Sequence, residues 1–352
     1  MVGAVRWQRH ATRSACSVLL MIGAASCKPN LEGRPSLIDS PRVVAISSNL
    51  KASTEDGVAI AEVSPEDSVT YDVLVASPID EQSVPQYDWA LCTLRKPLAE
   101  SGPISHSCLE PSGPDLLDLG TSSSVVAQIP KDVCQNFGPI TPTQKPGEPA
   151  IRPEDPDTTG GYYQPVRLLT RYSSDDAEYE VGVTRVSCGI ALGASQQNTV
   201  EFRQKYRPNA NPRIQSVMLT QRDGSQIDID LAEGATPLSV HPGDKVQFQA
   251  SWPPCPSQPG DSACEGAEAY LNYDTVTQSL ADRRESIRVS WYATEGSYDH
   301  DRTGRSEGEA DLSTTSNAWV APDSTGEVRF WLVIRDDRRG VNWTQFDLGV
   351  VK

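Results

Sequence analysis

The strongest constraint on the fold is a two-residue alternation of apolar and polar side chains in several short segments. It is clearest in DKVQFQASW (244–252) and recurs in ESIRVSWYA (285–293) and SVTYDVLVA (68–76). Successive side chains of a strand point to opposite faces, so such segments predict strands with one buried and one wet side. Helical periodicity is scarce, and 27 Pro and 25 Gly separate the segments. The pattern predicts an all-β fold of antiparallel sandwiches.

The two halves of the chain repeat the same order of segments, which indicates a duplicated domain. The matching pairs are PRVVAI (41–46) with PRIQSV (212–217), SPEDSVTYDVLV (64–75) with HPGDKVQFQASW (241–252), the segments around Trp89 and Trp291, and TSSSVVAQIP (121–130) with TTSNAWVAP (314–322). We therefore expect two tandem domains, 41–208 and 209–352. Their long insertions, at 95–120, 131–161 and 253–285, are expected to be loops, and loops on a rigid scaffold often carry binding.

The second half resembles bacterial Ig-like and PKD-like domains. The resemblance lies in the Pro-Gly-Asp turn at 242–244, the tryptophan strand and AWVAPDSTGEVRFWLVIRDDRRG (318–340). It implies a sandwich in which Trp291 fills the gap between two sheets about 10 Å apart. The first half matches less closely, with PEDSV in place of that turn. The whole layout resembles uncharacterised lipoproteins of Gram-negative bacteria, a resemblance that implies no activity.

The amino terminus reads as an export signal. Arg6, Arg9 and Arg13 precede a small or apolar run from Ser14 to Ala25. This run has the length of a secretory h-region, about 7–15 residues. A membrane-spanning helix needs about 20 apolar residues. The segment therefore predicts cleavage and export.

The cysteine after this run resembles a bacterial lipobox. Ala24-Ala-Ser-Cys27 carries the small residues and the thiol that the motif requires, although Ala24 stands where Leu or Val is usual. The resemblance implies a signal peptide at 1–26, palmitate or other acyl groups on Cys27 and a tether at 27–40. Lys28, which is not Asp, implies an outer-membrane or cell-surface lipoprotein. The alternative is an ordinary signal cut near Ala25, which leaves Cys27 as a spare thiol.

Six cysteines remain after the expected cleavage, and an even number in an exported chain predicts three disulfides. Cys255 and Cys264 bracket a polar turn and are expected to pair. The other four lie in the first half, and we predict the pairs Cys92–Cys108 and Cys134–Cys188. No C-x-x-C spacing occurs, so a zinc cluster is not expected, and no cofactor is predicted.

The charge of the chain disfavours nucleic acid. The formal net charge is −16. Loss of residues 1–26 removes three arginines and no acid, which makes it −19. Such a surface repels polyanions and favours solubility. The expected partners are the membrane, through the lipid anchor, and a protein or a glycan.

Acidic and aromatic residues meet in the loop RPEDPDTTGGYY (152–163). Asp155, Asp157, Tyr162 and Tyr163 are candidates for binding a sugar or calcium. The alternative is that the acids are solvated and the glycines permit a turn into a strand.

One further loop begins like a calcium loop. In DHDRTGRSEGEA (299–310), Asp299, Asp301 and Thr303 fall at ligand positions one, three and five, but Ala310 stands where a bidentate Glu is required. A solvated acidic hairpin loop is the alternative, and it is favoured.

Trp331 is a candidate for sugar stacking. It follows Phe330 in one strand, so one of the two rings must face away from the sandwich core. The outward ring either stacks on a sugar or packs against the neighbouring domain, and packing is favoured.

The sequence lacks the usual signatures of catalysis. It contains no G-x-S-x-G and no H-E-x-x-H motif. We expect a non-enzymatic, lipid-anchored envelope or surface protein with a binding or structural role. The alternatives are a carbohydrate-active enzyme or its carbohydrate-binding accessory module, and a pure spacer.

Overall fold

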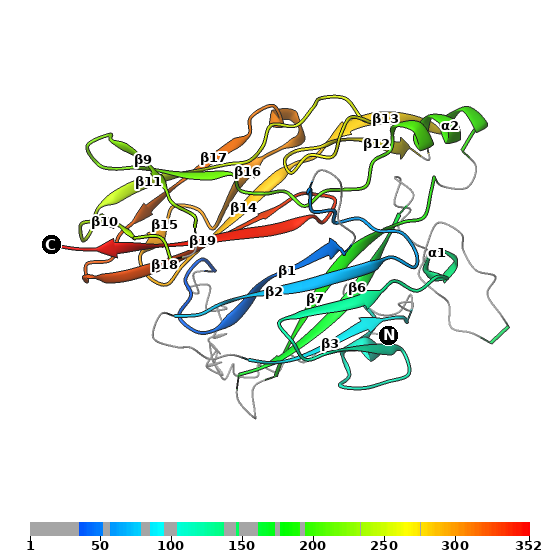
Figure 1. Cartoon of the computed structure of the whole chain (residues 1–352), viewed down its shortest axis with the longest axis horizontal. Helices are drawn as coiled ribbons and strands as arrows, with labels where there is room; N and C mark the ends of the chain where they lie inside the picture. Colours follow the sequence, from blue (N-terminus) through cyan, green and yellow to red (C-terminus); the bar gives the residue numbers. More distant parts are fainter. Residues whose placement is uncertain are drawn as a thin grey trace, which may run out of the picture. The chain divides into compact units, whose positions relative to one another are not determined.

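Two Ig-like β-sandwiches account for most of the strands (Figure 1). The computed structural model describes residues 35–51, 57–78, 85–94, 104–136, 146–147, 161–172, 177–190, 194–232, 234–274 and 276–352. Residues 34–352 form one compact unit. The all-β class predicted from the alternation and the two tandem sandwiches predicted from the repeat of segments are confirmed.

The first sandwich consists of a sheet in the order β1–β2–β5 and a sheet in the order β4–β3–β6–β7. The strands are β1 (Arg42–Leu50), β2 (Ser68–Ala76), β3 (Gln86–Cys92), β4 (Leu116–Gly120), β5 (Ser124–Gln128), β6 (Gly161–Arg171) and β7 (Ala177–Ser187). Trp89 is fully buried between the sheets, next to Tyr71.

The second sandwich has the sheets β15–β17–β11–β8–β9 and β10–β19–β18–β14–β16. The strands are β8 (Ser216–Thr220), β9 (Gln226–Ile229), β10 (Leu238–Val240), β11 (Lys245–Ser251), β14 (Ile287–Ala293), β15 (Ser297–Tyr298), β16 (Arg302–Arg305), β17 (Thr314–Val320), β18 (Gly326–Arg335) and β19 (Val341–Val350). One strand pair departs from the antiparallel prediction, because β10 pairs in parallel with β19.

The predicted repeat is visible in the topology. The order β1–β2–β5 in the first sandwich corresponds to β8–β11–β17 in the second, and β4–β3–β6–β7 corresponds to β16–β14–β18–β19. The strands matched by sequence therefore occupy equivalent positions, with Trp89 on β3 and Trp291 on β14.

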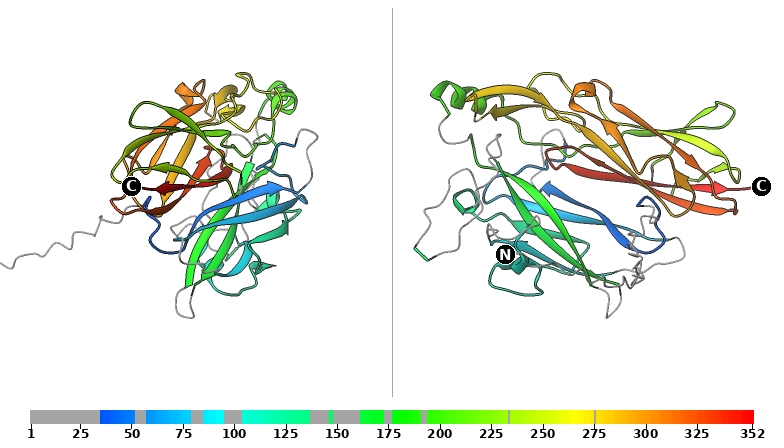
Figure 2. Two further views of the ribbon diagram at one scale, coloured as in Figure 1. Left: turned by 60° about the vertical axis from the view of Figure 1, so that its left-hand side comes forward. Right: turned by 180° about the vertical axis from the view of Figure 1, so that it is seen from behind.

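The remaining elements lie outside the two pairs of sheets. They are the hairpin of β12 (Ala269–Asp274) and β13 (Ser279–Arg284), the helices α1 (Val133–Asn136) and α2 (Gln196–Lys205), and the 3-10 turns at His106–Leu109 and Glu307–Glu309. Helix α2 starts at Ser195, whose hydroxyl accepts the Asn198 amide, and it lies beside the β12–β13 hairpin in Figures 1 and 2. Within the described ranges, no helix is long and apolar enough to cross a bilayer.

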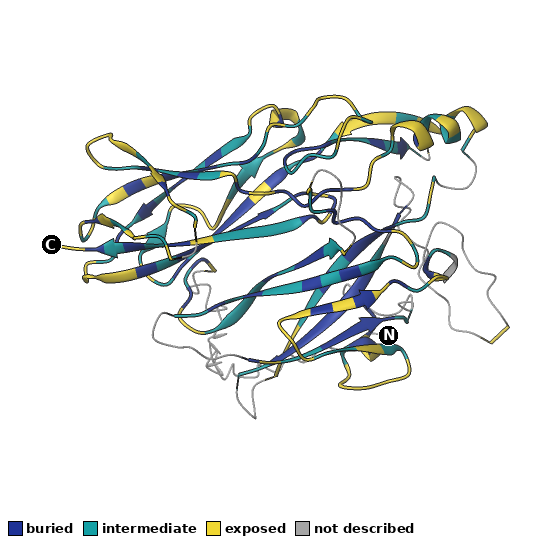
Figure 3. Cartoon of the chain, in the orientation of Figure 1, coloured by how far each residue is buried: buried dark blue, intermediate teal, exposed yellow. Residues whose placement is uncertain are grey.

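The alternation predicts the core correctly for β11 and β14. Phe248 and Trp291 are fully buried and belong to one aromatic cluster, and buried and exposed residues alternate along β11 (Figure 3). Strand β2 differs from the expectation of one wet face. Leu74 and Ala76, on its opposite face, are buried in a separate cluster that also contains Trp331. The second face is covered because the other sandwich packs against it.

All three predicted disulfides are present: Cys92–Cys108, Cys134–Cys188 and Cys255–Cys264. Each closes a loop within one half of the chain. The first two hold loops of the first sandwich, and the third closes the start of the insertion between β11 and β14.

Candidate functional site: an arginine-lined pocket beside a buried ionic junction

Several predicted site residues lie outside the described residues. These are Cys27, Asp155 and Asp157, and the side chain of Tyr162 is not described either. Lipidation at the first and ligand binding at the others remain predictions.

Tyr163 is described, and two guanidinium groups of the protein contact its ring. It lies on β6, with the guanidinium groups of Arg185 and Arg339 5.6 Å and 5.8 Å from the ring centroid. Burial raises the pKa of Tyr163 to about 12. The ring is half-buried and contacts two cations of the protein, and the binding of a sugar or calcium by Tyr163 stays a prediction.

The prediction that Trp331 stacks on a sugar is corrected. Phe330 lies in the core of the second sandwich, as the alternation requires, and Trp331 faces the other side of β18. There it is only 2% exposed and packs in the cluster of Leu74 and Ala76. The packing alternative holds, because the first sandwich covers the indole and leaves no face for a ligand.

The calcium-loop candidates do not converge on one point. Asp299 forms an ion pair with Lys245 at 2.9 Å, and the Thr303 hydroxyl accepts the Trp291 indole N–H at 2.9 Å. No group of three or more acidic, His or Cys residues suited to a metal occurs in the described part of the chain. The segment is not a hairpin loop either, because it crosses from β15 in one sheet to β16 in the other.

A polar pocket of about 610 Å³ lies on the outer face of the β10–β19–β18–β14–β16 sheet, and Asp301 belongs to its lining. Its lining is made mostly of charged and hydroxyl-bearing side chains. The lining residues are Pro35, Ser36, Ser286, Arg288, Ser290, Tyr292, Asp301, Arg302, Arg335, Asp336, Asp337 and Arg339.

The strand register explains why arginines gather here. On β14, Arg288, Ser290 and Tyr292 alternate with the buried core residues and so share the outer face. Arg335 on β18 lies directly opposite Arg288, and Arg302 on β16 lies opposite Ser290. Directly opposite residues of an antiparallel pair project to the same side, so three guanidinium groups share one surface.

These arginines lack acidic partners within the described residues. Arg288 and Arg302 are exposed, and neither forms an ion pair or a side-chain hydrogen bond there. Arg335 donates to the carbonyl of Val44 at 2.8 Å and to the Ser290 hydroxyl at 3.4 Å. Burial lowers the pKa of Arg335; the neighbouring Tyr292 opposes this shift, and the Arg302 charge adds to it. The three arginines therefore form no ion pair within the described residues, although Asp301, Asp336 and Asp337 line the same pocket.

Acceptors border the arginines. The Ser286 hydroxyl donates to Asp337 at 3.1 Å, and Asp301 and Asp337 are both exposed. The lining thus combines cations, carboxylates, hydroxyls and the ring of Tyr292. Such a mixture suits a polar ligand that offers both an anionic group and hydroxyl groups.

A buried ionic junction lies next to the pocket, centred on Glu62. Its carboxylate is fully buried and receives Arg338 at 2.9 Å, Arg185 at 3.3 Å and the amide of Asn209 at 3.0 Å. The Tyr206 hydroxyl donates to the other oxygen. Burial alone would raise the pKa of Glu62, but the two arginine charges outweigh it and lower the pKa.

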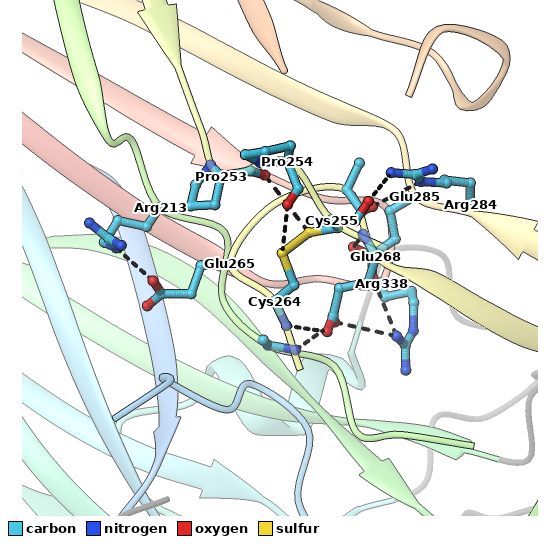
Figure 4. The surroundings of a disulfide bond; sticks show 12 residues. Arg213, Pro253, Pro254, Cys255, Cys264, Glu265, Glu268, Arg284, Glu285 and Arg338 are labelled. Atoms are coloured by element: carbon cyan, nitrogen blue, oxygen red, sulfur yellow. Dashed lines mark hydrogen bonds and ion pairs between the residues drawn. A yellow bond between two sulfur atoms is a disulfide. The ribbon is translucent and has the colours of Figure 1, made fainter. Parts of the chain in front are cut away.

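Three further carboxylates, those of Glu268, Glu285 and Asp336, are buried around Arg338. Glu268 accepts the amides of Ala210 and Cys264, both at 2.9 Å, beside the third disulfide (Figure 4). Glu285 accepts the amide of Glu268 at 2.9 Å and Arg338 at 3.3 Å. Burial raises the pKa of Glu268 to about 7. Burial and the neighbouring acids raise that of Glu285 well above its ordinary value.

Asp336 belongs to both the junction and the pocket. It is buried, accepts Gly340 N–H at 2.7 Å and the Asn209 amide side chain at 3.1 Å, and also lines the pocket. Burial raises its pKa to about 6. A Cβ on Gly340 would lie 2.1 Å from its carboxylate, so only glycine fits there. The β18–β19 turn therefore links the two features.

The sequence reasoning missed these residues. The alternation already placed Arg288 outward, and VIRDDRRG (333–340) concentrates three arginines in an acidic chain. This local concentration of arginines was the signal in the sequence that could have indicated the pocket. The sequence could not reveal that Arg302 and Arg335 lie on the two strands that flank the strand of Arg288, because the strand order is a property of the tertiary structure.

No protein-family model matches the chain, and no curated protein matches it. Among solved structures, the C-terminal domain of the Streptococcus agalactiae antigen I/II polypeptide BspA is 11% identical, with 88% of this chain and 100% of that one covered and a TM-score of 0.22. A Salmonella alpha-2-macroglobulin mutant is 8% identical, with 88% of this chain and 17% of that one covered and a TM-score of 0.19. Latent PorU from Porphyromonas gingivalis is 14% identical, with 87% of this chain and 24% of that one covered and a TM-score of 0.19. Likenesses of this size assign neither a family nor a function.

Proposed function

We propose that this chain is an exported, lipid-anchored envelope or surface protein that binds a partner without catalysis. Three features support the export step. The first 26 residues have the layout of a cleaved signal, Cys27 follows small residues as in a lipobox, and six cysteines form three disulfides. Disulfides persist in oxidising compartments, which lie outside the bacterial cytosol.

The observation that carries the binding role is the arginine-lined pocket. A cavity of about 610 Å³ is within the size range of ligand sites. Its cations have no acidic partner in the described chain, although the chain as a whole carries a formal charge of −16. Exposed arginines that form no ion pair within the described residues, as Arg288 and Arg302 are here, are suited to a partner from outside the molecule.

The lipid anchor is tested by metabolic labelling with radioactive palmitate. Cys27→Ser should remove the label and shift the protein from the membrane fraction to the soluble fraction. Cys16→Ser is the matched control, since Cys16 lies in the expected signal peptide and should leave labelling intact. An unlabelled wild-type protein with an uncut amino terminus would contradict the anchor.

The binding role is tested on an array of glycans and proteins probed with the full chain. Arg302→Gln should weaken any specific signal, whereas Arg222→Gln, at an exposed turn position outside the pocket, should not. Unchanged binding by Arg302→Gln would show that the binding site lies outside this pocket. The absence of any signal on the array would favour a structural spacer.

A carbohydrate-active enzyme is the second candidate, and one observation favours it. Asp301, Asp336 and Asp337 all line the pocket, and glycoside cleavage uses two carboxyl groups. Hydrolysis of an arrayed glycan that is lost in Asp337→Asn and retained in Arg222→Gln would establish this reading in place of pure binding.

A further inference from the structure

We infer that the arginine-lined pocket binds an acidic sugar residue, with Arg288, Arg302 and Arg335 holding its carboxylate. This inference rests on the proposed binding function and names the ligand class of the same site. The ligand class follows from the register of the strands, the chemistry of the lining and the size of the cavity.

The arrangement of the three arginines favours the binding of one anion. Arg288 and Arg335 are cross-strand neighbours, and like charges directly opposite each other destabilise a sheet. Arg302 adds a third guanidinium on the next strand. A carboxylate placed among them would relieve this repulsion, and guanidinium groups match its two oxygens in a bidentate arrangement.

The groups around the arginines indicate what the rest of the ligand carries. Ser286, Ser290, Asp301 and Asp337 offer hydroxyls and carboxylates around the cations. Carboxylates accept hydrogen bonds from sugar hydroxyls, whereas they would repel a second negative charge. A phosphate-rich or polyanionic ligand therefore fits less well than one carboxylate on a hydroxylated ring.

The pocket is larger than a single anion requires. Tyr292 lines it on the same face of β14 as Arg288, and the Arg42 guanidinium lies 5.8 Å from the centroid of its ring. A volume of about 610 Å³ exceeds what a single carboxylate needs, so the pocket has room for the sugar that carries it.

The test is calorimetric titration of the purified full chain with the methyl glycoside of galacturonic acid, which carries a single carboxylate. Its methyl ester and the methyl glycoside of galactose serve as the uncharged comparisons. We expect the acid to bind at least about tenfold more tightly than either, as a charged hydrogen bond requires. Affinity should fall as salt screens the contact.

The double variant Arg288→Gln/Arg302→Gln should lose about tenfold or more in affinity, because both exposed arginines are removed. The double variant Arg203→Gln/Arg222→Gln, at two exposed positions outside the pocket, is the charge-matched control and should bind as the wild type does. Arg335 is left intact, since it bonds the backbone of β1. Unchanged circular dichroism and unfolding temperature would establish that the double variant is folded.

Inorganic phosphate forms the remaining arm. Phosphate binding as tight as that of the uronic acid would overturn the sugar assignment, and so would equal affinity for the acid and its ester. If the array detects another partner whose binding does not depend on Arg288 and Arg302, this inference fails while the binding function stands. If nothing binds at all, both fail.

Discussion

Glu62 and Arg338 lie 276 positions apart in the chain, and their side chains meet at 2.9 Å in a buried ion pair between the two sandwiches. Arg338 stands in the β18–β19 turn and is 5% exposed, whereas Glu62 is fully buried. Two charges removed from water in this way are stable only when other groups satisfy them. Here Tyr206, Asn209 and Glu285 do so.

Glu62→Gln should destabilise the protein by about 3–5 kcal/mol, because it leaves Arg185 and Arg338 buried without their central partner. Urea denaturation followed by circular dichroism measures the change. Glu307→Gln is the matched control: it breaks an exposed pair with Arg283 and should cost no more than about 1 kcal/mol. Equal losses in the two variants would contradict a structural role for the junction.

Stability should fall as pH rises from about 4.5 to about 7. The folded-state pKa values of Asp336 and Glu268 are raised to about 6 and about 7. The folded protein therefore binds more protons than the unfolded chain in this range, and the stability present at low pH is lost as these groups ionise. Glu62 has a lowered pKa and acts in the opposite sense, losing its contribution only below its ordinary value.

The measurement is the free energy of unfolding at intervals between pH 4.5 and pH 8. Glu268→Gln should flatten the decline by about 1–3 kcal/mol. Asp282→Asn, at an exposed position on β13, should keep the slope of the wild type. A slope unchanged by Glu268→Gln would rule out this residue as its source.

Trp331→Ala should destabilise the protein by about 3–5 kcal/mol, since it empties the cluster between the sandwiches. Trp331→Phe keeps most of the volume and should cost clearly less. Thermal unfolding monitored by far-ultraviolet circular dichroism compares the two. A small loss in both would mean that Trp331 packs loosely, against its 2% exposure.

Removal of Cys134–Cys188 should cost about 4 kcal/mol and removal of Cys255–Cys264 about 3 kcal/mol, because the chain-entropy contribution grows with the size of the closed loop. The sequence separations are 54 and 9 residues. Paired Cys→Ser variants and urea denaturation test the order. The reverse order would show that local packing around Cys264, whose amide bonds Glu268, outweighs loop entropy.

The sequence alone determined much of the fold. Period-two alternation placed Phe248 and Trp291 in a core and set the all-β class, because the pleat of a strand makes neighbouring side chains face opposite ways. The repeat of segments identified equivalent strands in both halves. The split of the cysteines between the halves indicated the pair Cys255–Cys264. The four cysteines of the first half allow three pairings, and the predicted pairing of sequence neighbours is the one observed.

Only the tertiary structure decided what covers each outward face. Alternation placed Arg288 on the outer side of its strand and required that one of Phe330 and Trp331 face outward too. In the structure Trp331 does so and is buried by the first sandwich, whereas Arg288 is exposed. The same holds for Glu62, which meets Arg338 only when distant segments pack together. A local pattern specifies which side chains share a face. Burial and the pairing of charges depend on non-local contacts, and these decide where the pocket and the junction form.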